Sequence, residues 1–158
     1  MPKHLFLCRH AHTQDAMTNQ RDFDRELSPA GIQEAILAGD FIKSFGLSID
    51  AFFCSAAIRT QQTAREIAGL LSFDNTKLKS NQDLYYIKSP DLLQQITSFD
   101  NNWQAVIIIG HNPVVSEVVS MLSNKNIYVP TGGCNYFKSE TPDWQSLAWS
   151  PFELKMNY

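Results

Sequence analysis

Short apolar segments alternate with longer segments of helical periodicity, and this alternation constrains the fold more than any other feature. The clearest apolar segment, WQAVIIIG at 103–110, is dense in β-branched residues and too short to cross a membrane. Further strands are expected at 4–8, 49–54, 77–82, 134–139 and 146–150, the last two on either side of a TPD turn. Strands that alternate with helices predict an α/β three-layer sandwich, with helices on both faces of a mainly parallel central sheet.

Capping residues mark the expected helices. The helix expected over 29–45 is preceded by Ser28 as N-cap and followed by Gly46. Its inward face is predicted from apolar or small residues at helical spacing: Ile32, Ala35, Ile36, Gly39 and Ile42. Further helices are expected over 57–71, after Ser89 as a cap, and from Pro113 onward.

Length and composition predict the general class of protein. A chain of 158 residues is long enough for one domain and too short for two ordinary ones, so we expect a single domain over 1–158. A net charge of −3 argues against nucleic-acid binding, and no apolar stretch is long enough for a membrane helix. The first residues lack the pattern of a signal peptide, which predicts a cytoplasmic protein. We expect a monomer or a weak dimer.

The three cysteines are odd in number and widely spaced, which argues against a disulfide framework. Cys8 and Cys54 lie in apolar segments, and Cys134 follows a TGG turn into a strand. All three are therefore expected to pack as small apolar side chains in a reducing compartment.

Charged motifs follow three of the expected strands. RHAHT (9–13), SAAIRT (55–60) and GHNP (110–113) begin where the first, second and fourth strands end. In open α/β sheets, ligands bind beyond the carboxyl ends of the strands. The guanidinium groups of Arg9 and Arg59 match phosphate oxygens, and helix N-termini near 57 and 113 add backbone donors. This combination predicts a phosphoryl site, while the missing GxxxxGK[ST] loop argues against a nucleotide-hydrolysing P-loop.

Histidines supply the reactive groups at these junctions. A neutral imidazole is a competent nucleophile toward phosphorus when cations neutralise the oxygens around it, and a second imidazole can donate a hydrogen bond to those oxygens. Structural roles for His10 and His111, and a surface ion pair for Arg59, are the alternatives. His10 and His12 also form an H-x-H pair that can bind metal, but further metal ligands are lacking. We expect His12 at the rim of the site, and neither metal nor cofactor.

The segments LCRHAHT, CSAAIRTQQTA and IIIGHNPVVSEV resemble, in order and spacing, the motifs of the histidine phosphatase superfamily, which has the phosphoglycerate-mutase-like fold. Among its branches the chain is similar to the small SixA-type phosphohistidine phosphatases. The likeness runs from residue 4 to about 150 and includes DRELSPAG (24–31) and a late tryptophan, Trp144.

The resemblance implies a role for each matched residue. His10 would be the nucleophile that becomes phosphorylated, and Arg9, Arg59 and His111 would bind the phosphoryl group. The supporting phosphate-binding residues would be Thr13, Ser55 and Asn112. Asp24 and Arg25 are expected to cap and pair near the first long helix rather than to act in catalysis.

Departures from the family pattern bear on the substrate. Ala56 and Glu26 stand where relatives often have proline, which affects loop stiffness. Larger relatives place an acid after the third strand to protonate an alkoxide leaving group; here Gln82 stands there, with Asp83 beside it as the possible general acid. An imidazole leaving group can instead take its proton from water. The sequence therefore favours phosphohistidine, on a protein, as the substrate.

Two alternative functions stay open. The first is a small-molecule phosphomonoesterase of the same superfamily, which would need Asp83 or another acid. The second is a non-catalytic module that binds phosphate or a phosphoprotein.

Overall fold

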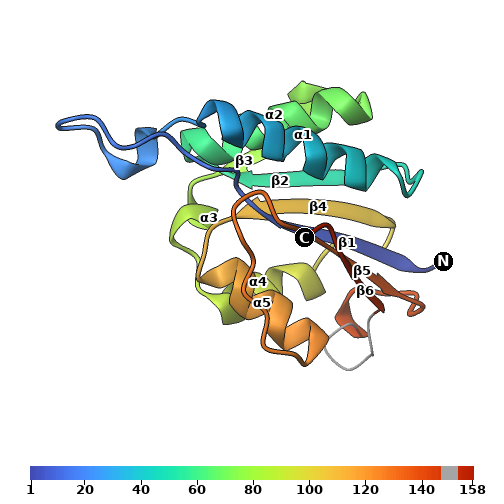
Figure 1. Ribbon diagram of the computed structural model, residues 1–158. Helices are drawn as coiled ribbons and strands as arrows, with labels where there is room; N and C mark the ends of the chain where they lie inside the picture. Colours follow the sequence, from blue (N-terminus) through green and yellow to red (C-terminus); the bar gives the residue numbers. More distant parts are fainter. Residues whose placement is uncertain (147–152) are drawn as a thin grey trace.

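A six-stranded sheet forms the centre of the protein, with strand order β3-β2-β4-β1-β5-β6. The computed structural model in Figure 1 describes residues 1–146 and 153–158. The strands are β1 (Lys3–Arg9), β2 (Ala51–Ser55), β3 (Leu78–Asn81), β4 (Ala105–Gly110), β5 (Cys134–Ser139) and β6 (Glu153–Met156). The first four strands pair in parallel, while β5 and β6 are antiparallel additions at one edge.

Helices cover both faces of this sheet. Figure 1 shows α1 and α2 on one face and α3, α4 and α5 on the other. The helices are α1 (Pro29–Lys43), α2 (Ile58–Leu71), α3 (Asp83–Tyr86), α4 (Ser89–Thr97) and α5 (Val114–Ser123), with 3₁₀ turns η1 (Asp22–Asp24) and η2 (Asn75–Lys77). The predicted three-layer sandwich with a mainly parallel sheet is confirmed.

The central strands supply side chains to both layers. Because successive strand residues point to opposite faces, Phe6 of β1 packs with the α1–α2 core and Leu5 with the core of α4 and α5. In β4, Ile107 likewise packs with the α1–α2 core and Ile108 with the core of α4 and α5. All six residues of β4 are buried, which explains its near-continuous apolar sequence.

Helix α1 begins as predicted, and its buried face agrees with the prediction at Ala35, Gly39 and Ile42 but not at Ile32. Ser28 is the N-cap, and its Oγ accepts a hydrogen bond from the Gly31 N–H at 3.0 Å. Ile32, predicted to face inward, is 39% exposed. The buried residues of α1 are Gly31, Ala35, Ala38, Gly39 and Ile42. A Cβ at Gly31 would lie 2.0 Å from the His12 carbonyl oxygen, so glycine lets the first turn of α1 pack closely against the segment that follows β1.

Two local features of the helices depart from the sequence predictions. Ser89 is not an N-cap: it lies in the first turn of α4 after Lys88, and its hydroxyl donates to Glu117 at 2.8 Å. The short helix α3 was not predicted. Most of the strand expected at 146–150 lies outside the described residues. Strand β6, which was not predicted, pairs with β5.

The three cysteines are free and buried, as the packing prediction requires. Within the described ranges, no helix combines the length and the hydrophobicity needed to cross a membrane.

Candidate active site

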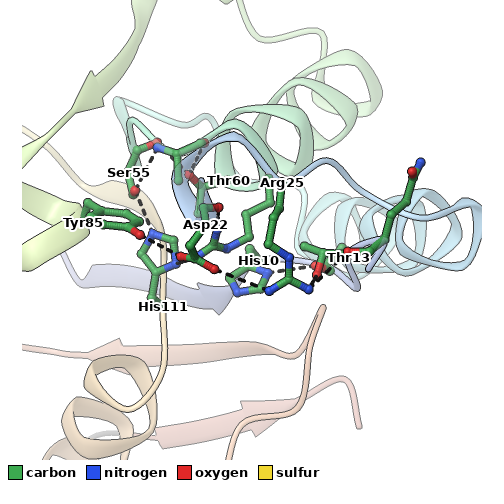
Figure 2. A network of polar contacts seen from close by, with 12 residues as sticks. His10, Thr13, Asp22, Arg25, Ser55, Thr60, Tyr85 and His111 are labelled. Carbon is green, nitrogen blue, oxygen red and sulfur yellow. Dashed lines mark hydrogen bonds and ion pairs between the residues drawn. The ribbon is translucent and has the colours of Figure 1, made fainter. Parts of the chain in front are cut away.

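The three charged motifs meet at the carboxyl ends of β2, β4 and β1, which are neighbours in the sheet. The backbone N–H of His10 donates to Gly110 O at 3.1 Å, so the segments after β1 and β4 stay in register. This brings the His10 and His111 rings to a centroid separation of 5.3 Å. Figure 2 shows the His111 imidazole beside Ser55 and Tyr85, with Asp22 near both imidazoles.

His10 is buried at the end of β1, with 8% of its surface exposed. Its Nδ1 lies 2.8 Å from the carbonyl oxygen of Ala11. Because a carbonyl only accepts, Nδ1 carries the proton, and Nε2 of the neutral ring is left with a free lone pair. Burial, with further contributions from the charges of Arg59 and Arg9, lowers the pKa of His10 to about 4. The imidazole is therefore neutral at pH 7 and carries a nucleophilic nitrogen.

His111 is fixed in the opposite tautomer. Its Nδ1 lies 3.3 Å from Nη2 of Arg59, and its Nε2 lies 2.7 Å from Oγ of Ser55. A guanidinium only donates, so Nδ1 accepts and Nε2–H donates to the serine. Burial first, and then the neighbouring His10 and Arg59, lower the pKa of His111 to about 3.

Arg59 stands in the first turn of α2 and is 7% exposed. Its Nη1 donates to the Asp22 carbonyl oxygen at 2.7 Å and its Nη2 donates to Asp22 Oδ2 at 2.9 Å. The Tyr85 hydroxyl donates to the same carboxylate oxygen at 2.6 Å. The Tyr85 ring also lies 5.9 Å from the guanidinium carbon and packs edge-on against His111. Asp22 and Tyr85 therefore complete the surroundings of the predicted arginine and histidine.

Arg9 is the last residue of β1 and contacts the segment before β5. Its Nη1 donates to the Tyr128 hydroxyl at 3.1 Å and to the Val129 carbonyl at 3.3 Å, and the guanidinium lies 5.8 Å from the Tyr128 ring centre. Both arginines thus donate hydrogen bonds to acceptor atoms of the protein itself.

The supporting residues lie in different surroundings. Ser55 contacts His111 directly, while the Thr13 hydroxyl accepts from Arg25 Nη2 at 2.7 Å. Asn112 supports a loop: its Nδ2 donates to Val129 O, and its Oδ1 accepts from the backbone and hydroxyl of Ser116.

The segment after β3 reaches the site through Tyr85. Asp83, the possible general acid, is exposed in the first turn of α3, and Gln82 beside it is exposed as well. Tyr85, two residues further on, donates to Asp22. The segment that the sequence analysis named for Asp83 therefore reaches Asp22 through Tyr85, and a role for Asp83 as the general acid stays a prediction.

Asp22 and Tyr85 are the residues that sequence reasoning missed. Asp22 sits in a polar loop with no periodic pattern, and its contact with Arg59 spans 37 positions. The expected pairing near the first helix is also different: Asp24 pairs with Arg21, while Arg25 lies 3.4 Å from Asp22.

His12 turns away from His10 toward helix α1. Its Nδ1 lies 2.7 Å from the Ser28 hydroxyl, and its backbone N–H donates to Glu34 Oε1 at 2.8 Å. Among the residues with described positions, no three histidine, cysteine or acidic side chains are grouped to hold a metal ion. The H-x-H alternative has no geometric support in this part of the chain.

Comparison with known proteins identifies the family. The model of the histidine phosphatase superfamily (branch 1) matches residues 5–85, which hold the first two charged motifs. The chain belongs to the histidine phosphatase superfamily. An uncharacterised protein of Mycobacterium tuberculosis H37Rv is 29% identical over 103 residues, which is 65% of this chain and 62% of that protein. The match thus spans less than two thirds of this relative's length.

Solved structures share the fold of this superfamily member. The putative phosphohistidine phosphatase SixA of Nakamurella multipartita superposes with a TM-score of 0.82 at 22% identity, over 98% of this chain and 94% of that one. The corresponding protein of Agrobacterium tumefaciens gives a TM-score of 0.77 at 25% identity, over 88% and 93% of the two chains. The phosphoglycerate-mutase-like fold and the SixA-like resemblance are confirmed.

Proposed function

We propose that this chain is a metal-independent phosphatase that hydrolyses phosphohistidine on a protein through a covalent phosphoenzyme formed on His10. Family membership and similarity to proteins named as phosphohistidine phosphatases support a phosphatase. The observation that carries the mechanism is the buried, neutral His10 ring, whose Nδ1 proton is held by Ala11 O.

In the first step, the lone pair of His10 Nε2 attacks phosphorus, and the bond between phosphorus and the leaving nitrogen breaks. Arg9 and Arg59 neutralise the phosphoryl oxygens, which otherwise repel the nucleophile. His111 lies beside His10 and contributes a second imidazole to the same pocket. Water then attacks the phosphoenzyme, releases inorganic phosphate and restores His10.

The carboxylate at Arg59 supports a phosphoramidate substrate over an ester. The hydrogen bond from Tyr85 first, and then the interactions with Arg59, lower the pKa of Asp22 to about 2. Asp22 is therefore ionised at neutral pH and has no proton to give to an alkoxide. A departing imidazole can be protonated by water on its far nitrogen, so it needs no such acid. The proposed partner is accordingly a phosphohistidine-bearing protein, whereas an ester substrate would need its proton from Asp83 or another acid.

Phosphate release in the presence of a metal chelator tests this function. We expect faster release from a phosphohistidine-bearing protein than from a simple phosphate ester. The variant His10→Ala should lose activity by about a thousandfold or more, because it removes the nucleophile. The matched control is His4→Ala, at the other end of β1, where His4 contacts Tyr136 and not the site.

Three results would contradict the proposal in different ways. Preference for the ester would make the protein a general phosphomonoesterase. Phosphate binding without turnover would make it a binding module. Full activity of His10→Ala would exclude the phosphoenzyme on His10.

A further inference from the structure

Asp22 places a negative charge inside a pocket that is otherwise suited to bind an anion. Its backbone oxygen and carboxylate take hydrogen bonds from both terminal nitrogens of Arg59. Tyr85 donates to the carboxylate from one side, and Arg25 approaches from the other at 3.4 Å. Figure 2 shows the Asp22 carboxylate between Tyr85 and Arg25, close to His111.

A carboxylate and a phosphoryl group compete for the same donors. A guanidinium has five N–H donors in a fixed plane, and both anions bind them through paired oxygens. Two contacts of Arg59 are made to Asp22, and a third is made to His111. A phosphoryl group that takes up the full fork of Arg59 must therefore displace at least the Asp22 carboxylate.

The burial of the two partners indicates which one moves. The Arg59 side chain is 9% exposed, whereas the Asp22 side chain is 53% exposed. Arg59 belongs to the long helix α2, while Asp22 lies in the three-residue turn η1 within the excursion between β1 and α1. Figure 1 shows this excursion extending away from the rest of the molecule. The arginine is thus the fixed partner, and the carboxylate is the one that can withdraw into solvent.

We propose that Asp22 is a positioning residue that competes with the phosphoryl group for Arg59. The carboxylate holds the guanidinium in place beside His111 when the site is empty, withdraws when a phosphoryl group binds, and returns when inorganic phosphate leaves. Asp22 thereby weakens the binding of the product. The inference rests on the proposed function, because it takes the pocket around Arg59 to be the phosphoryl site.

The test is the dissociation constant of inorganic phosphate, measured by titration calorimetry on the full chain at neutral pH. Asp22→Asn keeps the size of the side chain and removes its charge. We expect this variant to bind phosphate about tenfold more tightly than the unmodified protein, because a like charge beside the bound anion is gone. The matched control is Asp24→Asn, which removes a charge from the same turn, where Asp24 pairs with Arg21. The control should bind phosphate as the unmodified protein does.

A second pair of variants tests the role of Tyr85. Tyr85→Phe removes the hydrogen bond that holds the Asp22 carboxylate, so it should also tighten phosphate binding, by about twofold to threefold. Tyr86→Phe removes a hydroxyl from the adjacent, exposed tyrosine and should leave the constant unchanged. The melting temperature of each variant shows whether it is folded.

The outcomes separate this inference from the proposed function. Weaker or unchanged phosphate binding by folded Asp22→Asn would overturn the competition and would leave Asp22 as a purely structural anchor, without affecting the proposed function. If phosphate does not bind to the unmodified protein or to Asp24→Asn, the phosphoryl site itself is wrong and both proposals fail. Turnover of phosphohistidine by the unmodified protein, together with tighter binding by Asp22→Asn, supports both.

Discussion

The two imidazoles of the site are neutral and hold their protons on different nitrogens. His10 carries its proton on Nδ1, toward Ala11 O, and His111 carries its proton on Nε2, toward Ser55. These assignments follow from the partners, since a carbonyl can only accept and a guanidinium can only donate. One ring therefore presents a free lone pair, while both nitrogens of the other are occupied when the site is empty.

Because both rings are buried in their neutral form, the stability of the fold depends on pH. The pKa of His10 falls to about 4 and that of His111 to about 3, whereas an unfolded histidine titrates near 6.5. Above pH 6.5 both histidines are neutral in the folded protein and in the unfolded chain, so their protonation costs no stability. As the pH falls below 6.5, the unfolded chain takes up protons that the folded protein refuses, and stability is lost progressively down to the folded pKa values.

We therefore expect the free energy of unfolding to fall between pH 7 and pH 5 by on the order of 2 kcal/mol for each of the two histidines. Denaturant titration at both pH values measures this loss. In His10→Ala the free energy of unfolding should fall by about 2 kcal/mol less over the same pH range, because only His111 then contributes. An equal loss in the variant would show that His10 is not buried in its neutral form.

Ser55 is expected to matter through His111. Ser55→Ala leaves the Nε2–H of His111 without its acceptor in a buried site, where such a loss costs about 1–3 kcal/mol. We expect phosphohistidine turnover to fall by about tenfold or more, with the fold retained. Ser80→Ala, an exposed serine in the neighbouring strand β3, is the control. Equal activity of the two variants would contradict the proposed support of His111.

Helix α1 approaches the segment after β1 so closely that only glycine fits at the contact. An added Cβ at Gly31 would lie 2.0 Å from the His12 carbonyl oxygen, and neither atom belongs to a flexible side chain. Gly69 in α2 has nothing within 4 Å of the same position. The two helical glycines therefore give a matched pair of alanine substitutions.

Gly31→Ala should destabilise the protein by about 1–3 kcal/mol through overpacking, and should lower activity because the segment that carries His10 must shift. Gly69→Ala should stabilise the protein by about 0.5–1 kcal/mol, since alanine is the better helix former. Thermal unfolding and phosphate release measure both effects. A stable and fully active Gly31→Ala would show that α1 does not fix the position of this segment.

Among the helices and strands, the sequence predicted those features that depend on neighbouring residues or on the periodicity of apolar side chains. Strand β4 and the Ser28 cap of α1 were found because apolar runs and capping chemistry are local signals. The inward face of α1 was predicted in part: Ala35, Gly39 and Ile42 are buried as expected. Ile32 is exposed, and the first turn instead packs through Gly31, whose close approach leaves no apolar signal. The short helix α3 was missed because four residues give no periodicity.

At the scale of the molecule, the sheet order brings distant motifs together. The placement of Arg9, Arg59 and His111 at one edge of the sheet could be predicted because each follows a predicted strand, and parallel strands end at one edge. Their role in phosphate binding stays a prediction. Asp22 and Tyr85 were not found, because their contact depends on the path of an irregular loop and joins positions 63 residues apart. Loop contacts of this kind leave no periodic signal in a single sequence.

The opposite end of the sheet is expected to serve stability rather than chemistry. Trp144 is fully buried there: its Nε1 donates to Trp103 O at 3.0 Å, and its ring lies 5.8 Å from Lys3 Nζ. We expect Trp144→Ala to cost about 3–5 kcal/mol of stability and to leave the KM for a phosphohistidine substrate unchanged below the melting temperature. A raised KM in the folded variant would contradict this separation.

The central claim is that Nε2 of His10 becomes phosphorylated during turnover. The most direct measurement is to mix the protein with a phosphohistidine-bearing protein, stop the reaction in base, which preserves phosphohistidine, and locate the phosphoryl group by peptide fragmentation. We expect a transient phosphoryl group on His10 that appears before inorganic phosphate and is absent from His10→Ala. Release of inorganic phosphate with no phosphoryl group on His10 at any time would contradict it.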